Sequence, residues 1–414
     1  MLDIKFIREN LEACKKAAIN KNREVDWDRL LALDEKRRLL IGKSDDLRKQ
    51  RNLASGPADA KARETGKKIK EDLKKIEDEL RAVEDEFNML MYTVPNVPDS
   101  SVPVGKDSTG NKELRTWGKV PKFDFTPKDH IELAKTLDLI DFDRGVKVGG
   151  FRSYFLKNEL AMLEMAVVSY AFRKLSKKGY CTLTAPSLVK DFTLFGNGQF
   201  PWGREEVYHL EKDDLYLAGT AEVPVTAYYS NEVLSEKDLP KKFVAYSPCF
   251  RREIGSYGKD TKGVYRVHQF NKIEQVIISK NDTSTSLTLL EELLANAEEI
   301  LQDFELPYRV LLMCTGDMGE PQVKKYDIET WMPSRGAYGE TMSDSFMGEF
   351  QARRLKIRYK TKDNTVLFCH TLNNTAIASP RILIAILENN QQKDGSIRIP
   401  KVLQPFMGKT EIRR

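Results

Sequence analysis

The residues best suited to chemistry in this sequence are charged side chains that follow a predicted strand. Segment 247–275 has the pattern of a strand, a glycine-rich loop and a second strand, and the first strand ends in Arg251, Arg252 and Glu253. Arginine offers phosphate or carboxylate groups a planar, bidentate fork, and glycine lets the backbone approach a ligand closely. The pattern favours a clamp over a polyphosphate, although a plain surface hairpin would also explain the glycines and the loop lysines Lys259 and Lys262.

Several common catalytic motifs are absent from the chain. It contains no G-x-x-x-x-G-K-[ST] phosphate loop, no G-x-G-x-x-G after a strand, no H-E-x-x-H and no G-x-S-x-G. The 5 cysteines are far apart, form no C-x-x-C, and have only 4 histidines as potential partners. We therefore expect neither a disulfide framework nor a structural zinc site, and we expect a cytoplasmic protein.

The positive charge of the chain is concentrated near its N-terminus. The 414 residues carry a net charge of +5, but segment 36–75 holds 14 Lys and Arg against 6 Asp and Glu, or +8, which leaves −3 for the remainder. A basic projection suits a polyanion such as nucleic acid, whereas on charge alone a solvated helical surface is an equally good explanation. No apolar run approaches the roughly 20 residues of a membrane span, so we expect no membrane partner.

The same region carries a heptad pattern. Apolar residues recur at alternating spacings of four and three over segment 69–90, and the frame continues upstream, where Arg37, Ser44 and Arg51 interrupt it. Gly56 and Pro57 lie between the two segments and should break a helix. We predict two long antiparallel helices, over about 27–92, that form a projecting coiled-coil arm.

Beyond about residue 115 the pattern changes to short β-branched or aromatic runs that alternate with helical segments. Helices are predicted at about 128–140, 157–178, 284–303 and 380–391, and strands within 180–186, 214–220, 243–250, 264–279, 307–313 and 365–372. Because strands outnumber helices and some follow one another closely, we predict an α+β domain with a mostly antiparallel sheet flanked by helices. The expected organisation is an N-terminal domain over 1–100, a linker over 101–115 and a second domain over 116–414.

These segments resemble the class II aminoacyl-tRNA synthetases, and in detail the seryl-tRNA synthetase family. Segment 247–275 resembles motif 2, and LAGTAEVPVTAYYSNEVL at 217–234 resembles the family's serine-binding TAE loop. Segment 370–408 resembles motif 3, and KKGYCTLTAPSLV resembles motif 1, the dimer element, with Pro186 as its proline. The N-terminal hairpin is similar to the family's tRNA-binding arm, so the likeness covers essentially the whole chain.

The resemblance implies an enzyme that activates L-serine with ATP to seryl-adenylate and transfers serine to the 3′-terminal adenosine of serine tRNA, with selenocysteine tRNA as a further candidate substrate. It implies Mg²⁺ as the companion of ATP and a homodimer as the assembly. The expected tRNA contacts on the arm are Lys43, Lys49, Arg51, Lys61, Lys67 and Lys68.

The resemblance also implies a nucleotide site. Arg251 would bind the α-phosphate and the serine carboxylate, while Arg381 would cover one adenine face and reach the γ-phosphate. Glu253 would accept a hydrogen bond from the adenine amino group, and Phe270 would stack on the other face of the ring. The full set of expected ATP contacts is Arg251, Arg252, Glu253, Val267, Phe270, Glu340, Thr341, Met342, Ser343 and Arg381, with Glu340 and Ser343 as the metal ligands.

For serine, the resemblance implies that Thr220 and Glu222 receive the ammonium group and that Glu274 and Thr375 bind the hydroxyl. Ala221 and Arg251 complete the expected serine site. A pocket that hydrogen-bonds a hydroxyl rejects alanine strongly, because its own polar groups would stay unpaired.

Two alternatives remain open at this stage. One is the related armless class that charges a carrier protein, against which the basic hairpin argues. The other is an RNA-binding relative with an inactive catalytic domain, against which the complete set of charged motif residues argues. Motif 3 also departs from the general pattern, because Asn374, Ala376 and Pro380 stand where some class II members carry glycine.

Overall fold

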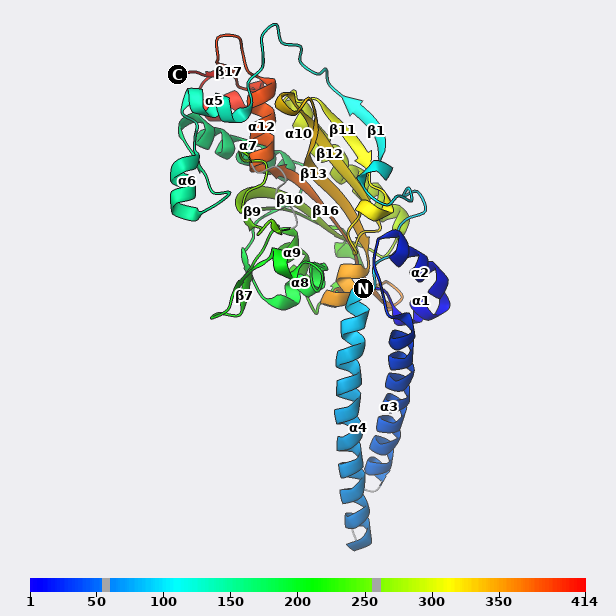
Figure 1. Ribbon diagram of the computed structural model, residues 1–414. Coiled ribbons are helices and arrows are strands. Elements are labelled where there is room, and N and C mark those ends of the chain that lie inside the picture. The colour runs from blue at the N-terminus through cyan, green and yellow to red at the C-terminus, as the bar shows by residue number, and fades with distance from the viewer. Residues whose placement is uncertain (54–59, 255–261) are drawn as a thin grey trace. The chain divides into compact units, whose positions relative to one another are not determined.

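The computed structural model describes residues 1–53, 60–254 and 262–414 (Figure 1). The chain divides into two compact units, residues 1–95 and 96–414. Within the described ranges, no helix combines the length and the apolar character needed to cross a membrane.

The first unit contains two short helices, α1 (Ile4–Glu9) and α2 (Leu11–Asn20), followed by two long ones, α3 (Trp27–Leu53) and α4 (Ala60–Thr93). Ion pairs between α3 and α4 show that the long helices are antiparallel, because Arg29 bonds Glu86 at 2.6 Å while Arg48, further along α3, bonds Glu77 at 2.9 Å, earlier in α4. The helical hairpin predicted over 27–92 is therefore present. The expected break at Gly56 and Pro57 lies outside the described residues.

The predicted heptad positions form the apolar seam of this hairpin. The buried seam residues are Leu30, Leu33, Leu40, Ile69, Leu73, Val83 and Phe87. Two polar residues that interrupt the pattern are accommodated within the helix pair: the Arg37 guanidinium lies 5.4 Å from the centre of the Phe87 ring, and Ser44 is buried. Burial of one helix face against the other gives these two long helices the tertiary support that isolated helices lack.

The second unit is built around one large sheet, which has eight strands in the described part of the chain. Neighbouring strands are antiparallel except for β4, which pairs parallel to β9 at one edge. In spatial order the strands are β1 (Lys112–Trp117), β11 (Tyr308–Leu312), β12 (Lys324–Met332), β13 (Ala337–Gly348), β16 (His370–Ala378), β10 (Gln269–Ser279), β9 (Lys241–Phe250) and β4 (Cys181–Thr184). The predicted mostly antiparallel α+β fold is confirmed.

The three helices that contribute most to the core of this sheet are α7 (Asn158–Lys177), α10 (Thr283–Asp303) and α12 (Ser379–Asn389) (Figure 1). Each lies within one or two residues of a predicted helix. Helix α10 begins where it does because the Asp282 carboxylate accepts a hydrogen bond from the Thr285 amide at 2.7 Å. The remaining helices are α5 (His130–Leu137), α6 (Phe142–Gly149), α8 (Asp191–Asn197), α9 (Glu222–Thr226), α11 (Phe350–Leu355) and α13 (Gln404–Met407).

Two predicted strands differ from the structure. The strand expected over 264–279 begins only at Gln269, and the run expected over 365–372 divides at Cys369 between two sheets. The smaller sheets contain β15 (Val366–Phe368), β14 (Arg358–Lys360) and β8 (Val233–Ser235); β5 (Leu188–Val189), β7 (Leu215–Leu217) and β6 (Tyr208–Leu210); β2 (Ile140–Asp141) and β3 (Phe155–Leu156); and β17 (Ile397–Arg398) and β18 (Glu411–Ile412).

The segment expected to contain the linker belongs to the second unit. The Asn96 side chain donates to the Met347 carbonyl at 2.8 Å, and the Asp99 amide donates to the Val323 carbonyl at 2.8 Å. Strand β1 then pairs with β11. The division after Pro95 precedes the boundary expected near residues 100–115, because the irregular segment that follows Pro95 bonds to residues just before β12 and at the end of β13.

Asp344 of β13 is a carboxyl group buried in the core, and its protonation makes the folding stability depend on pH. Its side chain is fully buried, and neither carboxyl oxygen has a well-formed hydrogen bond within the described residues. Burial, reinforced by the charges of Glu291 and Glu274, raises the pKa of Asp344 well above its ordinary value. The folded chain therefore retains a proton that the unfolded chain releases above about pH 4, so folding stability falls as pH rises through this range.

Asp344→Asn cannot titrate, so its stability relative to the wild type should increase as pH rises above about 4, by roughly 1 kcal/mol per pH unit for as long as folded wild-type Asp344 keeps its proton. Thermal unfolding of both proteins across this pH range measures the difference. A constant difference in Tm would contradict a protonated Asp344.

Candidate active site

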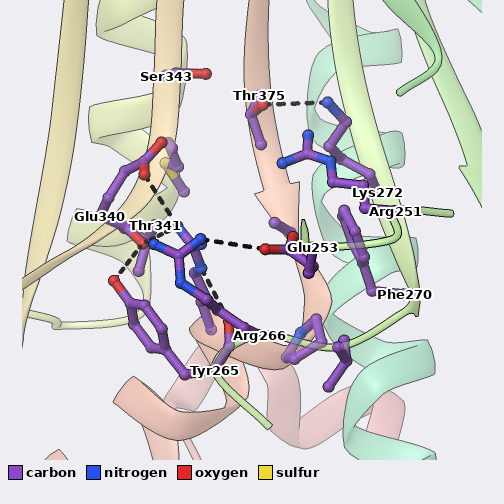
Figure 2. Close-up of a pocket in the computed structure, with 15 residues that line it drawn as sticks. Arg251, Glu253, Tyr265, Arg266, Phe270, Lys272, Glu340, Thr341, Ser343 and Thr375 are labelled. Carbon is purple, nitrogen blue, oxygen red and sulfur yellow. Dashed lines mark hydrogen bonds and ion pairs between the residues drawn. The ribbon is translucent and has the colours of Figure 1, made fainter. Parts of the chain in front are cut away.

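A pocket opens where β10, β13 and β16 meet the start of α12 (Figure 2). Most of the predicted ligand-binding residues line it, and they come from segments far apart in the sequence. The lining residues are Arg251, Glu253, Tyr265, Arg266, Val267, Phe270, Lys272, Glu340, Thr341, Met342, Ser343, Thr375, Ala378, Pro380 and Arg381. Its mixture of apolar and charged side chains suits a small polar ligand.

One wall of the pocket is an ion pair between α12 and β13. Arg381 Nη1 lies 3.1 Å from Glu340 Oε2 and also donates to the Glu340 carbonyl at 2.9 Å. The Arg381 guanidinium lies 4.4 Å from the centre of the Tyr265 ring. Burial alone would raise the pKa of Glu340, but the positive charges of Arg381 and Lys325 outweigh it and lower this pKa to about 2. Glu340 is therefore ionised at neutral pH.

The opposite side of the pocket carries Arg251, Lys272 and Phe270 (Figure 2). The Arg251 guanidinium lies 5.3 Å from the centre of the Phe270 ring, and its Nε donates to the Gly219 carbonyl at 3.2 Å. These contacts orient a cation and an aromatic face toward the same space.

Glu253 and Arg266 form an ion pair at 3.3 Å between the two sides of the pocket (Figure 2). Glu253 has φ +56°, a left-handed conformation that is uncommon for a residue other than glycine and that often accompanies functional sites. This backbone conformation turns the chain at the end of the motif 2 strand.

A buried polar group lies deeper, around Lys272. Its Nζ lies 2.7 Å from Glu274 Oε2 and donates to Thr220 Oγ1 at 2.6 Å and to Thr375 Oγ1 at 3.5 Å. Thr375 in turn donates to Glu274 Oε2 at 3.2 Å. Glu274 has no exposed surface and does not line the pocket directly, but two of its partners, Lys272 and Thr375, do.

Glu222 and Ala221 lie beside this group without lining the pocket. The Glu222 amide donates to Thr220 Oγ1 at 3.1 Å, and its carboxylate accepts from Gln351 Nε2 at 2.8 Å. Removal from water, followed by the negative charge of Glu274, raises the pKa of Glu222. A cation that entered between the two carboxylates would relieve this repulsion.

The remaining residues of the predicted ATP site differ in their positions relative to the pocket. Arg252 does not line the pocket; it is exposed, with its guanidinium 6.0 Å from the centre of the Tyr208 ring. Thr341 and Met342 line the pocket, but the Thr341 hydroxyl is bonded within the sheet and the Met342 side chain belongs to the core. Val267 is also buried at the pocket wall.

The two predicted metal ligands have the right chemistry for Mg²⁺. Glu340 supplies an ionised carboxylate and Ser343 a hydroxyl, both hard oxygen donors that face the same pocket. Within the described residues, no group of three His, Cys, Asp or Glu side chains is arranged to hold a metal ion.

The main residue that the sequence analysis missed is Lys272. Lys272 could have been predicted from its position in a strand, because side chains two residues apart lie on the same face of a strand. Phe270, Lys272 and Glu274 therefore face the same side. Tyr265, Arg266, Ala378 and Pro380 were also absent from the predicted site and line the pocket.

The residues predicted for macromolecular contacts lie on accessible surfaces. Pro186 is exposed and follows β4, an edge strand of the large sheet. Of the predicted tRNA contacts on the hairpin, Lys43, Lys49, Arg51, Lys67 and Lys68 are exposed. The side chain of Lys61 and the loop residue Lys259 lie outside the described residues.

The antiparallel sheet, the arginine-lined pocket and the motif 3 helix together define the second unit as a class II aminoacyl-tRNA synthetase core. The family model of the tRNA synthetase class II core domain (G, H, P, S and T) matches residues 206–390, and that of the seryl-tRNA synthetase N-terminal domain matches residues 1–98.

Full-length relatives give the more particular assignment. The serine–tRNA ligase of Deinococcus radiodurans is 46% identical over 100% of this chain and 99% of its own length, and that of Pseudothermotoga lettingae is 45% identical over 99% of each chain. The crystal structure of seryl-tRNA synthetase from Pyrococcus horikoshii complexed with ATP has a TM-score of 0.92 and 39% identity, covering 100% of this chain and 99% of that chain. This chain belongs to the seryl-tRNA synthetase family, as its sequence motifs predicted.

Proposed function

We propose that this protein is an ATP-dependent serine–tRNA ligase that forms seryl-adenylate and then transfers serine to the 3′-terminal adenosine of serine tRNA. The observation that carries the proposal is the single pocket in which Arg251, Arg381 and Glu340 meet Lys272 and Thr375, the partners of buried Glu274. Family membership supports the same reaction.

In the first step the serine carboxylate oxygen attacks the α-phosphorus of ATP, a new O–P bond forms, and pyrophosphate leaves. Such a displacement depends on positioning and on neutralising negative charge more than on proton transfer. Arg251 binds the α-phosphate and the serine carboxylate together. Arg381 binds the γ-phosphate and so favours departure of pyrophosphate.

The adenine ring lies between Phe270 and the Arg381 guanidinium, and Glu253 accepts a hydrogen bond from its amino group. A planar cation can cover a π face and bind a phosphate because its charge is spread over a flat group. Glu340 and Ser343 would hold Mg²⁺, which would supply neutralisation of phosphate charge.

Serine is held by the buried group around Lys272. Thr220 and Glu222 bind the ammonium group. A cation at this position would lower the raised pKa of Glu222 and so favour its ionised form. Glu274 and Thr375 bind the hydroxyl. Alanine and glycine lack the hydroxyl and so lose the hydrogen bonds that serine makes with these two groups.

Lys272→Met removes the counter-ion of Glu274 and the bond to Thr220 together. Breaking a buried pair leaves an uncompensated charge, so the KM for serine should rise about a hundredfold while the KM for ATP changes little. Steady-state exchange kinetics measure both constants. The matched control is Lys242→Met, because Lys242 pairs with Glu292 at 2.7 Å but does not line the pocket.

An unchanged serine KM in Lys272→Met would contradict the role of this lysine. A KM that rose equally in Lys242→Met would show that general destabilisation was responsible.

The helical arm supplies the contact with serine tRNA through its exposed cations. We propose a cytoplasmic homodimer, with the β4 edge near Pro186 in the interface and the arm of one subunit presenting tRNA to the active site of the other. Backbone phosphates are the natural targets of lysines and arginines on a helical hairpin, so recognition by RNA shape is expected.

ATP–pyrophosphate exchange with each of the twenty amino acids tests the proposed activity. Exchange should depend on serine and should be at background level with alanine and glycine. Background exchange with every amino acid, from folded protein, would favour the inactive RNA-binding alternative. Serine-dependent exchange without charging of serine tRNA would favour the carrier-protein alternative.

A further inference from the structure

Glu388, near the C-terminal end of α12, connects α12 to the segments that contain Ser334 and His130 through hydrogen bonds. Its fully buried carboxylate accepts hydrogen bonds from the Ser334 amide at 2.9 Å and the Ser334 hydroxyl at 2.8 Å. The same carboxylate accepts from the His130 amide at 3.0 Å and lies 3.0 Å from His130 Nδ1. A buried carboxylate with this many partners is held firmly in place and fixes its partners in turn.

The bond to Glu388 determines which nitrogen of His130 carries the proton. An ionised carboxylate can only accept, so Nδ1 holds the hydrogen and Nε2 is left as an acceptor. The Val264 amide donates to this Nε2 at 3.4 Å. The backbone before His130 is fixed as well, because Lys128 exchanges two hydrogen bonds with the Gln391 side chain, at 2.7 and 2.9 Å.

The chain passes close to the imidazole at this point. Gly263 has φ +67°, and a Cβ added there would lie 2.0 Å from His130 Nε2. Glycine therefore allows both the left-handed turn and the close approach that brings the Val264 amide to the ring. His130 has 8% of its surface exposed and lies at the start of α5, far from motif 2 in the sequence.

Val264 directly precedes Tyr265, which organises the nucleotide side of the pocket. The Tyr265 carbonyl accepts from Arg381 Nε at 3.2 Å, and its hydroxyl donates to the Glu340 carbonyl at 3.4 Å. The guanidinium groups of Arg381 and Arg335 lie 4.4 and 4.3 Å from the centre of its ring. A displacement of the Val264 backbone would therefore move Tyr265 and misalign Arg381.

We propose that His130 is a positioning residue for ATP: held by Glu388, it fixes the Val264 backbone and, through Tyr265, sets the position of the Arg381 guanidinium. This inference rests on the proposed function, because it assigns Arg381 to the nucleotide. The serine side is held by a separate set of bonds around Lys272, so His130 should affect the two substrates unequally.

Two substitutions separate the bonds that His130 makes. His130→Asn keeps a donor near the position of Nδ1 for Glu388 but removes the acceptor for Val264. His130→Gln places an amide oxygen near the position of Nε2 and so can restore that acceptor. The experiment measures the Kd of a non-hydrolysable ATP analogue by calorimetry, the KM for serine in exchange, and the Tm of both variants and the wild type.

We expect His130→Asn to weaken binding of the analogue about tenfold, because a buried amide loses its partner, and to leave the KM for serine within about twofold of the wild type. His130→Gln should recover most of that affinity. Gly263→Ala, which drives a methyl group into the imidazole, should weaken the analogue at least as much as His130→Asn.

Wild-type affinity for the analogue in His130→Asn would overturn the inference. Equal losses in His130→Asn and His130→Gln that follow the fall in Tm would also overturn it, because a purely structural histidine predicts that result. Absence of serine-dependent exchange in the wild type would instead refute the proposed function, so the two failures are distinguishable.

Discussion

Replacing Arg251 by glutamine should reduce serine-dependent ATP–pyrophosphate exchange about a thousandfold, since a charged group aimed at a transition state typically contributes this much. The Arg251 guanidinium is held by the Gly219 carbonyl at 3.2 Å and lies over Phe270, inside the pocket. Glutamine retains a polar side chain but has neither the charge nor the fork that binds an α-phosphate and a carboxylate together. Exchange kinetics at saturating serine and ATP provide the measurement.

Arg252→Gln is the matched control for this substitution. Arg252 is the next residue in the chain and is exposed, as Arg251 is, but it does not line the pocket. Its replacement should leave exchange within a fewfold of the wild type. Equal losses in the two variants would mean that general positive charge, and not the placement of Arg251, supports the reaction.

Shortening the helical arm should separate the two steps of the reaction. Replacing residues 43–76 by a short glycine–serine turn removes the predicted tRNA-contacting cations and keeps the ion pairs Arg29–Glu86, Lys36–Glu79 and Arg37–Glu84 at the base of the hairpin. Charging of serine tRNA should fall about a hundredfold or more, because each lost phosphate contact removes favourable counter-ion release. Adenylate formation should remain near the wild-type rate, since the pocket lies wholly within the second unit.

A full-length variant tests the charges on the arm without removing the helices. The five exposed residues Lys43, Lys49, Arg51, Lys67 and Lys68 are replaced by glutamine. We expect charging to weaken and its dependence on salt to become less steep, with exchange unchanged. Loss of exchange to the same degree as charging would contradict the assigned division between arm and pocket.

The sequence predicted the architecture well because its patterns are local. The heptads of the arm depend on spacing within each helix, and burial of Leu30, Leu73 and Phe87 follows from that spacing. Polar interruptions were harder to interpret: Arg37 stays in the seam because its guanidinium packs on Phe87 across the hairpin, a contact that depends on the pairing of two helices.

Most of the residues predicted for the site line one pocket, but the bonds among them were not predicted. The motif resemblance named Glu274 and Thr375 but missed Lys272. The Lys272 ammonium group forms an ion pair with Glu274 and donates a hydrogen bond to Thr375. Residue spacing alone does not reveal that β10 and β16 place Glu274 opposite Thr375, next to a bulge in the pairing. Likewise, the bond from the Val264 amide to His130 joins residues 134 positions apart, which only the folded chain brings together.

The central claim is that one pocket binds the nucleotide and serine together. A crystal structure of the protein with a non-hydrolysable seryl-adenylate analogue tests it most directly. We expect adenine between Phe270 and Arg381, the phosphate mimic on Arg251, and the serine hydroxyl within hydrogen-bonding distance of Glu274 or Thr375. An analogue bound elsewhere, or a serine group turned away from Glu274 and Lys272, would contradict the account.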